Sequence, residues 1–306
     1  MLILTAPGQG AQTPGFLSPW LEIPSVAEQI GAWSELAGRD LTRLGTTGAA
    51  DEITDTAAAQ PLLVAAALAV AGLLPEPAAV AGHSVGELAA GAIAGVLSPA
   101  DAIRLTTVRG TAMARSCDAT PTGMTAVLGG DKATVLAAIA AAGLTPANVN
   151  GAGQIVAGGT REQLESFAAS PPAGARVRPL RVAGAFHTEH MAPAIAALAG
   201  AAAKAVIKDP AIILLSNRDG GVVTTGASWV ERVVGQVAAP VRWDLCMDTM
   251  AGIGVTALVE LVPGGTLTGL AKRAMPGVEL LALKTPDQLD AARALMAAHA
   301  PAGKEA

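Results

Sequence analysis

The sequence has no tyrosine and few other aromatic residues, which limits how its core can be built. Aromatic residues make up 2% of the 306 positions, whereas hydrophobic residues make up 51%. The core must therefore consist mainly of alanine, valine, leucine and isoleucine side chains. Only two cysteines occur, Cys117 and Cys246, and they form no paired motif. Neither a disulfide framework nor a metal site is expected from them.

Basic residues are also scarce. The 20 lysines and arginines are outnumbered by 25 aspartates and glutamates, which gives a formal net charge of −5. A nucleic-acid-binding protein needs clustered positive charge to neutralise phosphates, so this balance argues against one. A local basic patch remains compatible with it.

No hydrophobic run is long enough to cross a membrane. The most apolar uncharged stretch, residues 62–74, lies between Pro61 and Pro75. As a helix it would measure roughly 20 Å, whereas the core of a bilayer is about 30 Å thick. The N-terminus shows neither a basic region nor a cleavage site. We therefore expect a soluble, cytoplasmic protein without membrane association, in which residues 62–74 form a buried helix.

Short apolar strands alternate with helices over most of the chain. Its length exceeds that of a usual single core, so one large domain with an insertion, or two domains, is expected. The expected strands are residues 2–6, 78–82, 212–216, 257–261 and 279–283, and the expected helices are residues 57–74, 85–95, 98–115 and 285–299. This alternation predicts an α/β fold with a mainly parallel sheet that helices cover on both faces.

Residues 121–180 follow a different order. The expected strands here are residues 124–128, two runs within 148–159, and residues 176–180, with helices at 131–142 and 160–169. This order, βαββαβ, resembles a ferredoxin-like domain. We therefore expect a small domain of residues 121–187, inserted into a large domain that residues 1–120 and 188–306 form.

A glycine-bracketed serine lies where an expected strand meets an expected helix. The run Gly82-His83-Ser84-Val85-Gly86 matches the pattern G-x-S-x-G, in which a sharp turn exposes a nucleophilic serine. The helix that follows directs backbone N–H groups and its positive dipole end at the site, where they would stabilise an oxyanion. Ser84 is therefore predicted to be the nucleophile of an acyl-transfer enzyme. The alternative is a glycine-serine turn without chemistry.

A serine nucleophile needs a base, and histidine is the first candidate. The chain contains His83, His187, His190 and His299. His83 is expected to point away from Ser84, its neighbour on the turn. His187 ends the run Gly184-Ala185-Phe186-His187, in a loop from which its ring could reach Ser84, although an ordinary surface or packed histidine remains the alternative. Gln9, in Gly8-Gln9-Gly10, would reach the same sheet edge if the first strand lies beside the Ser84 strand.

A series of motifs, including those above, occurs in order along essentially the whole chain. They are Gly8-Gln9-Gly10, Gly82-His83-Ser84-Val85-Gly86-Glu87, Arg109-Gly110, Gly153-Gln154-Ile155-Val156, Gly184-Ala185-Phe186-His187, Gln236, Pro240-Val241-Arg242-Trp243 and Pro263-Gly264. Together they resemble the malonyl-CoA:acyl carrier protein transacylase family of bacterial type II fatty acid synthesis, particularly its actinobacterial members. The resemblance implies an α/β-hydrolase-like core, with a mainly parallel sheet, and an inserted ferredoxin-like subdomain.

The resemblance also implies a role for each catalytic residue. Ser84 attacks the malonyl thioester, and His187 acts as the general base. The backbone carbonyl of Gln236, instead of a carboxylate, holds the histidine tautomer. The backbone N–H groups of Gln9 and Val85 form the oxyanion hole.

Further residues are implied to recognise the substrate. Arg109 binds the free malonyl carboxylate with two parallel hydrogen bonds and disfavours acetyl-CoA, which lacks that group. Phe186 belongs to an Ala-Phe-His run that accompanies malonyl specificity in related acyltransferases, and it narrows the pocket against an α-methyl group. Asn148, Asn150 and Gln154 are candidates for lining the cleft between the domains, or for satisfying backbone groups within the small domain.

The implied reaction is a ping-pong acyl transfer. Malonyl-CoA acylates Ser84, and the phosphopantetheine thiol of acyl carrier protein then takes the malonyl group for fatty acid or polyketide elongation. No cofactor is implied, and a monomer is expected. An acidic carrier protein would dock on a local basic patch, for which the candidates are Arg178, Arg181, Lys272 and Arg273.

Two other functions compete with this one. An α/β-hydrolase esterase or thioesterase would place its acid and its histidine after the serine, and Asp290 and His299 could then serve. Alternatively, a subunit that binds a carrier protein or CoA could keep the fold without turnover.

Overall fold

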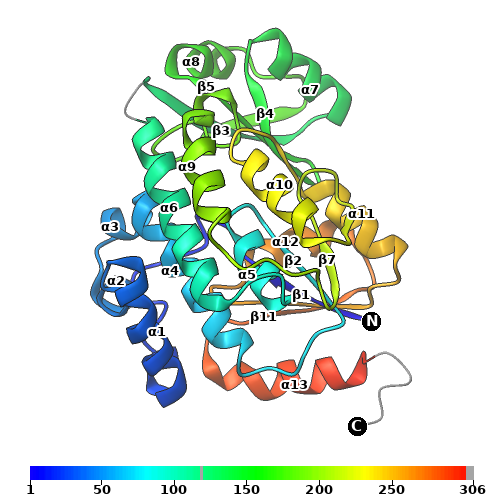
Figure 1. The fold of residues 1–306 in the computed structure, drawn as a ribbon. Coiled ribbons are helices and arrows are strands. Elements are labelled where there is room, and N and C mark those ends of the chain that lie inside the picture. Colours follow the sequence, from blue (N-terminus) through cyan, green and yellow to red (C-terminus); the bar gives the residue numbers. More distant parts are fainter. Residues whose placement is uncertain (118–119, 301–306) are drawn as a thin grey trace.

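The computed structural model describes residues 1–117 and 120–300 and shows a mixed α/β fold with two sheets (Figure 1). The larger sheet has six strands in the order β11-β10-β1-β2-β7-β8. Their bounds are β1 (Leu2–Ala6), β2 (Ala79–Gly82), β7 (Ile213–Leu215), β8 (Val222–Val223), β10 (Ala257–Glu260) and β11 (Glu279–Ala282). Neighbouring strands are parallel except for β7 and β8. The expectation of a mainly parallel sheet is therefore confirmed.

The larger sheet is covered on both faces because its strands are apolar on both sides. Every residue of β1, β2 and β10 is buried. Leu2 and Leu4 pack into one buried cluster, whereas Ile3 packs into a second one. Since side chains alternate between the two faces of a strand, these clusters lie on opposite faces of the sheet.

Helices form most of the remaining structure around the larger sheet (Figure 1). They are α1 (Pro24–Ala37), α2 (Leu41–Thr47), α3 (Ala50–Thr54), α4 (Thr56–Ala71), α5 (Gly86–Ile93), α6 (Pro99–Cys117), α9 (Pro193–Ala202), α10 (Gly226–Gln236), α11 (Trp243–Gly252), α12 (Thr266–Ala274) and α13 (Leu289–Ala298), with short 3-10 helices at Trp20–Glu22, Glu189–Met191 and Pro286–Gln288. The Ser98 hydroxyl accepts a hydrogen bond from the Asp101 backbone N–H at 3.0 Å, which satisfies a free donor at the start of α6. Ser98 thus caps the helix that was expected over residues 98–115.

The smaller sheet has the strand order β6-β3-β5-β4-β9. Its elements are β3 (Thr122–Gly129), α7 (Lys132–Ala141), β4 (Thr145–Gly151), β5 (Gln154–Thr160), α8 (Arg161–Ala169), β6 (Ala175–Pro179) and β9 (Val241–Arg242). The first four strands pair in antiparallel fashion, and the expected order βαββαβ is present. The fifth strand, β9, runs parallel to β4 and comes from far along the chain. A strand of two residues carries no periodic pattern, so the sequence did not predict it.

An ion-pair cluster joins the smaller sheet to the segment that supplies β9. Asp244, at the start of α11, is buried and accepts hydrogen bonds from Lys132 at 2.8 Å and from Arg242 at 3.0 Å. Lys132 belongs to α7, beside the smaller sheet. The contacts fix α11 and β9 against that sheet. These two elements follow α10, the helix that ends at Gln236.

Candidate active site

Ser84 lies on a tight turn between β2 and α5, at the carboxyl edge of the larger sheet. Its φ angle is 55°, in the left-handed region that residues with side chains rarely adopt. The turn closes because Gly82 and Gly86 have no side chains. A Cβ on Gly82 would clash with the backbone of Gly86, and one on Gly86 would clash with the carbonyl of Ala6. The structure thus contains the predicted G-x-S-x-G turn.

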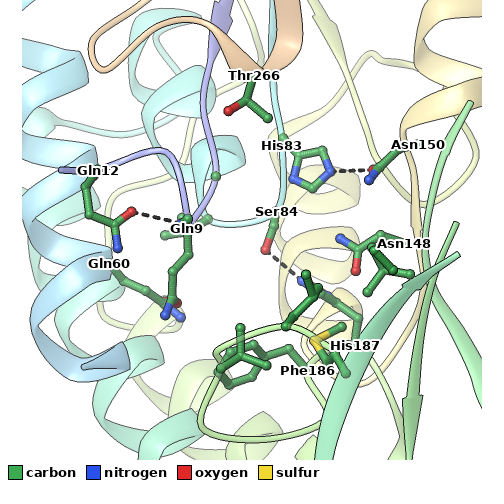
Figure 2. Close-up of a pocket in the computed structure, with 18 of the residues that line it drawn as sticks. Gln9, Gln12, Gln60, His83, Ser84, Asn148, Asn150, Phe186, His187 and Thr266 are labelled. Carbon is green, nitrogen blue, oxygen red and sulfur yellow. Dashed lines mark hydrogen bonds between the residues drawn. The ribbon is translucent and has the colours of Figure 1, made fainter. Parts of the chain in front are cut away.

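His187 is the histidine that reaches Ser84. Its Nε2 lies 2.7 Å from Ser84 Oγ (Figure 2). Its Nδ1 lies 2.9 Å from the backbone carbonyl oxygen of Gln236. A carbonyl only accepts hydrogen bonds, so Nδ1 carries the proton and Nε2 is free to accept one from the serine. Burial, aided by the nearby charge of Arg109, lowers the pKa of His187 to about 3. The imidazole is therefore neutral near pH 7 and can act as a base.

Arg109 is a buried cation next to the serine. The residue is 1% exposed and belongs to α6. It donates to Gln60 Oε1 at 2.7 Å and to Ser84 Oγ at 3.2 Å. Burial lowers the pKa of Arg109 to about 10, so the guanidinium remains charged near neutral pH. No carboxylate forms an ion pair with Arg109 within the described part of the chain, which leaves this charge available to an anionic ligand.

These three residues border a cavity of about 450 Å³. Its lining also includes the remaining predicted site residues apart from Gln236, namely Gln9, Val85, Phe186, Asn148, Asn150 and Gln154. Figure 2 shows Gln9 and Gln60 on one side of Ser84, with His83, Asn148 and Asn150 on the other. The cavity therefore lies between the large sheet and strands β4 and β5 of the small one.

Gln9 reaches the cavity because β1 and β2 are neighbouring parallel strands, as expected. Its side-chain Nε2 donates to the carbonyl of Thr54 at 3.3 Å and to Thr56 Oγ1 at 3.4 Å. The amide is thereby anchored where α3 ends and α4 begins. The next residue, Gly10, donates its backbone N–H to Gln12 Oε1 at 2.8 Å, which fixes the loop further.

His83 turns to the small sheet, as expected for a residue that points away from Ser84. Its Nε2 lies 2.9 Å from Asn150 Oδ1, and Asn150 donates to Gln154 Oε1 at 2.8 Å. The ring also makes an edge contact with Trp243 at a centroid distance of 5.7 Å. Burial lowers the pKa of His83. A neutral His83 thus links the serine turn to two amide side chains on β4 and β5.

Three residues near the serine were not assigned a role from the sequence. Asn217 follows β7 and is fully buried; its Oδ1 accepts the Ser84 backbone N–H at 2.7 Å, and its Nδ2 donates to the Gly82 carbonyl at 2.8 Å. Glu87 and Gln60 are also buried and contact Gln236 and Arg109, respectively. Of the three, only Glu87 gave a sequence signal, because it directly follows the glycine-serine motif.

Asp290 and His299, which the hydrolase alternative requires as acid and base, lie away from Ser84. His299 bonds to Thr256 Oγ1 at 2.7 Å and to Glu279 at 3.2 Å, beside the starts of β10 and β11. Ser84 follows the end of β2, which is the opposite edge of a parallel sheet. Asp290 is 94% exposed in its side chain and pairs with Arg293. Neither residue can form a triad with Ser84.

Two kinds of feature are absent from the chain outside residues 118–119 and 301–306. No group of three or more histidine, cysteine, aspartate or glutamate side chains there is arranged to hold a metal ion. In the same residues, no helix combines the length and the apolar character that crossing a bilayer requires.

Comparisons with known proteins relate the chain to acyltransferases. A family model described as "Acyl transferase domain" matches residues 7–297. The chain is 54% identical over 297 residues to a malonyl CoA-acyl carrier protein transacylase from Mycobacterium bovis, covering 95% of this chain and 98% of that protein. The crystal structure of MCAT from Mycobacterium tuberculosis superposes with a TM-score of 0.92 at 54% identity, covering 96% and 99% of the two chains. The chain also matches a structure of a type II polyketide synthase acyl-carrier protein in complex with its malonyl-transacylase. The TM-score is 0.90 at 29% identity, and the match covers 96% of this chain and 99% of that chain.

The fold, the family match and the serine-histidine pair together define an acyltransferase. More narrowly, the chain belongs to the malonyl-CoA:acyl carrier protein transacylase family. The resemblance that the sequence motifs indicated is therefore confirmed.

Proposed function

We propose that this chain transfers the malonyl group from malonyl-CoA to the phosphopantetheine thiol of acyl carrier protein, through a malonyl-Ser84 intermediate. The observation that carries the proposal is the 2.7 Å contact between Ser84 Oγ and His187 Nε2, next to the buried Arg109. The product would supply fatty acid or polyketide elongation. The cycle requires no cofactor, because side chains and backbone groups supply the nucleophile, the base and the anion-binding groups.

In the first half-reaction Ser84 Oγ attacks the thioester carbonyl carbon while His187 Nε2 takes the hydroxyl proton. A C–O bond forms, and the carbonyl oxygen becomes an oxyanion. When the tetrahedral intermediate collapses, the C–S bond breaks and His187 returns the proton to the CoA thiolate. The Gln236 carbonyl keeps the imidazole in the tautomer that both steps require.

The oxyanion is stabilised by the backbone N–H groups of Gln9 and Val85. Val85 directly follows the nucleophile at the start of α5, and Gln9 follows β1; both residues line the cavity. Backbone donors that the fold holds in place need no reorientation when the charge develops, which makes them effective in a site closed to water.

Arg109 binds the free carboxylate of the malonyl group. A guanidinium pairs with a carboxylate through two parallel hydrogen bonds, and burial strengthens the attraction. An acetyl group would leave the buried charge unpaired, so acetyl-CoA should be a poor substrate. Phe186, which is buried and lines the same cavity, would narrow it against an α-methyl group. A methyl group changes binding by only about 1–3 kcal/mol, so we expect selectivity against methylmalonyl-CoA to be partial.

In the second half-reaction the phosphopantetheine thiol enters, and His187 takes its proton. The thiolate attacks the malonyl ester, the C–O bond to Ser84 breaks, and the serine regains its proton. The acidic carrier protein would dock near Arg178, Arg181, Lys272 and Arg273, all of which are exposed. Arg181 borders the cavity, and α12, which carries Lys272 and Arg273, lines it through other residues. We further propose that the protein acts as a cytoplasmic monomer.

The architecture fits the same proposal. We assign residues 1–120 and 188–306 to an α/β-hydrolase-like domain, because a nucleophile turn follows an interior strand of a mainly parallel sheet. We assign residues 121–187 to a ferredoxin-like domain. Its support is the βαββαβ order together with the antiparallel arrangement β6-β3-β5-β4. On this division, β9 is a strand of the large domain that extends the small sheet.

A transfer assay tests the proposal. The purified chain would be incubated with holo acyl carrier protein and either malonyl-, methylmalonyl- or acetyl-CoA, and the acylated carrier would be measured. We expect rapid malonyl transfer, slower methylmalonyl transfer and little acetyl transfer, with none above background for Ser84→Ala. Equal transfer of all three groups, or hydrolysis without transfer, would contradict the proposed function.

A further inference from the structure

Glu87 is a buried carboxyl group that the proposed reaction does not use. It lies in the first turn of α5 and is 2% exposed. Within the residues that the structure describes, no lysine or arginine forms an ion pair with it. Burial raises the pKa of Glu87 to about 7, although hydrogen bonds from Asn217 and Gln236 and the charge of Arg109 oppose that rise. Burying such a group is costly, so its contacts are informative.

One oxygen of Glu87 supports the nucleophile turn. Oε1 accepts the backbone N–H of Asn217 at 2.9 Å. The side chain of Asn217 in turn accepts the Ser84 backbone N–H at 2.7 Å and donates to the Gly82 carbonyl at 2.8 Å. Glu87 thus fixes the residue that holds the turn at Ser84 and at Gly82, two positions before it.

The other oxygen supports the general base. Oε2 accepts a hydrogen bond from Gln236 Nε2, and Gln236 is 3% exposed. The backbone carbonyl of Gln236 accepts the His187 Nδ1 proton at 2.9 Å. The side chain of Gln236 therefore ties the carbonyl that orients His187 to the same carboxyl group.

We infer that Glu87 is a positioning residue that holds Ser84 and His187 in register with each other, through Asn217 on one side and Gln236 on the other. The inference rests on the proposed function, because it assigns Glu87 to the dyad of that reaction. No other residue in these contacts bonds to both branches at once.

The dyad needs such support because both members have unfavourable backbone conformations. The φ angles are 55° at Ser84 and 61° at His187, and neither residue is a glycine. Strain of this kind persists only where surrounding contacts hold it. The two residues also come from separate segments of the chain, so no local structure fixes their distance. A shift of about 1 Å in a reacting group can cost about 100-fold in rate.

Three single variants, one double variant and one control test the inference. Glu87→Ala removes the contacts to both branches. Asn217→Ala removes the contacts to the serine turn and a contact to Cys246 Sγ, but leaves the Gln236 branch intact. Glu87→Gln can keep both: its Oε1 accepts from Asn217, and its Nε2 donates to Gln236 once that amide is turned over. Met296→Ala is the stability control, because Met296 is buried in α13, away from the cavity lining.

The first readout is the rate at which malonyl-CoA acylates Ser84, measured by rapid quench. We expect Glu87→Ala to lower this rate by about 100-fold while KM stays within about threefold of the wild-type value. Glu87→Gln should restore most of the rate. The Glu87→Ala/Asn217→Ala double variant should be little slower than Glu87→Ala alone, because both changes act on one network.

The second readout does not depend on turnover. The Nδ1–H resonance of ¹⁵N-labelled His187 should shift or broaden in Glu87→Ala but not in Met296→Ala. If wild-type protein is not acylated by malonyl-CoA, the proposed function fails, and the resonance still tests the link to His187. If wild-type protein is acylated but Glu87→Ala matches it in rate and resonance, only the positioning role is overturned. Rate losses in Glu87→Ala and Asn217→Ala that multiply independently would also overturn it.

Discussion

Two sets of polar residues line the cavity, and only one of them contains titratable side chains. The catalytic set, Ser84, Arg109 and His187, combines a nucleophile with two titratable groups. The amide set, Asn148, Asn150 and Gln154, lies on β4 and β5 and has no titratable group. Charge is therefore buried where the reaction creates and moves charge, while neutral donors and acceptors line the other side. Under the proposed function, we expect the first set to perform the chemistry and the second to contact the substrate.

The largest effect should come from breaking the serine-histidine pair. Ser84→Ala and His187→Ala should each lower the transfer rate by about 10⁴-fold or more, because the nucleophile and its base act as a unit. Steady-state transfer to the carrier protein measures this, with His299→Ala as the matched histidine control. A His187→Ala variant that keeps most of its activity, or a His299→Ala variant that loses it, would be inconsistent with the site described above.

Removing the buried cation should separate substrates rather than abolish turnover. Arg109→Ala should lower kcat/KM for malonyl-CoA by about 100-fold, since a charge-assisted bidentate pair is lost. Acetyl transfer should be spared or improved, because the unpaired charge has gone. Arg104→Ala, an exposed position on the same helix, is the control. Equal losses for both substrates would refute the carboxylate role.

Glu87, which contacts the supports of the catalytic set, predicts a pH dependence of stability that the amide set cannot produce. The pKa of Glu87 is about 7 in the folded protein against an ordinary value of 4.5. Between those values the native state binds more protons, so the carboxyl group's contribution to stability is lost as pH rises. Relative to Glu87→Gln, the free energy of unfolding of the wild type should therefore fall by on the order of 3 kcal/mol from pH about 4.5 to pH about 7.

Urea unfolding of both proteins across that pH range measures the difference. It should be constant above about pH 8, where Glu87 is ionised in both the folded and unfolded states. A difference that rises with pH in the same window would show that Glu87 is ionised more readily in the folded protein, contrary to its burial.

The smallest effect should come from the amide set. Asn150→Ala removes the partner of His83 and of Gln154 without touching the dyad. We expect KM for malonyl-CoA to rise by about tenfold while kcat changes by less than about threefold, which is typical of lost uniform binding. Steady-state kinetics at several malonyl-CoA concentrations separate the two constants. A larger loss in kcat than in KM would place Asn150 with the catalytic set.

The sequence predicted the parts of the site that local motifs encode. The G-x-S-x-G turn identified Ser84 because strand, turn and helix are contiguous, and the parallel sheet correctly placed Gln9 at the same edge. The residues alone left His187 as one of several histidines, and the family resemblance was needed to select it. The structure then resolved the choice by distance, since His187 is the histidine within 2.7 Å of the serine.

The remaining contacts could not be predicted because they join distant segments. Asn217 and Glu87 are 130 positions apart, and Glu87 and Gln236 are 149 positions apart. Motifs mark Glu87 and Gln236, whereas Asn217 is an ordinary polar residue in its segment. No local pattern shows that the three meet, because only the packing of α5, β7 and α10 brings them together. Strand β9 escaped prediction for a similar reason, because its pairing with β4 depends on the register of a sheet formed far earlier in the chain.

If Ser84 carries the malonyl group between two thiols, a covalent adduct must form on Ser84 before the carrier protein takes part. The chain would be mixed with malonyl-CoA in the absence of carrier protein, quenched in acid and analysed by intact and peptide mass spectrometry. We predict a mass increase of one malonyl group, located on Ser84, absent from Ser84→Ala and discharged when holo carrier protein is added before the quench. Transfer to the carrier protein without any adduct on Ser84 would contradict this account.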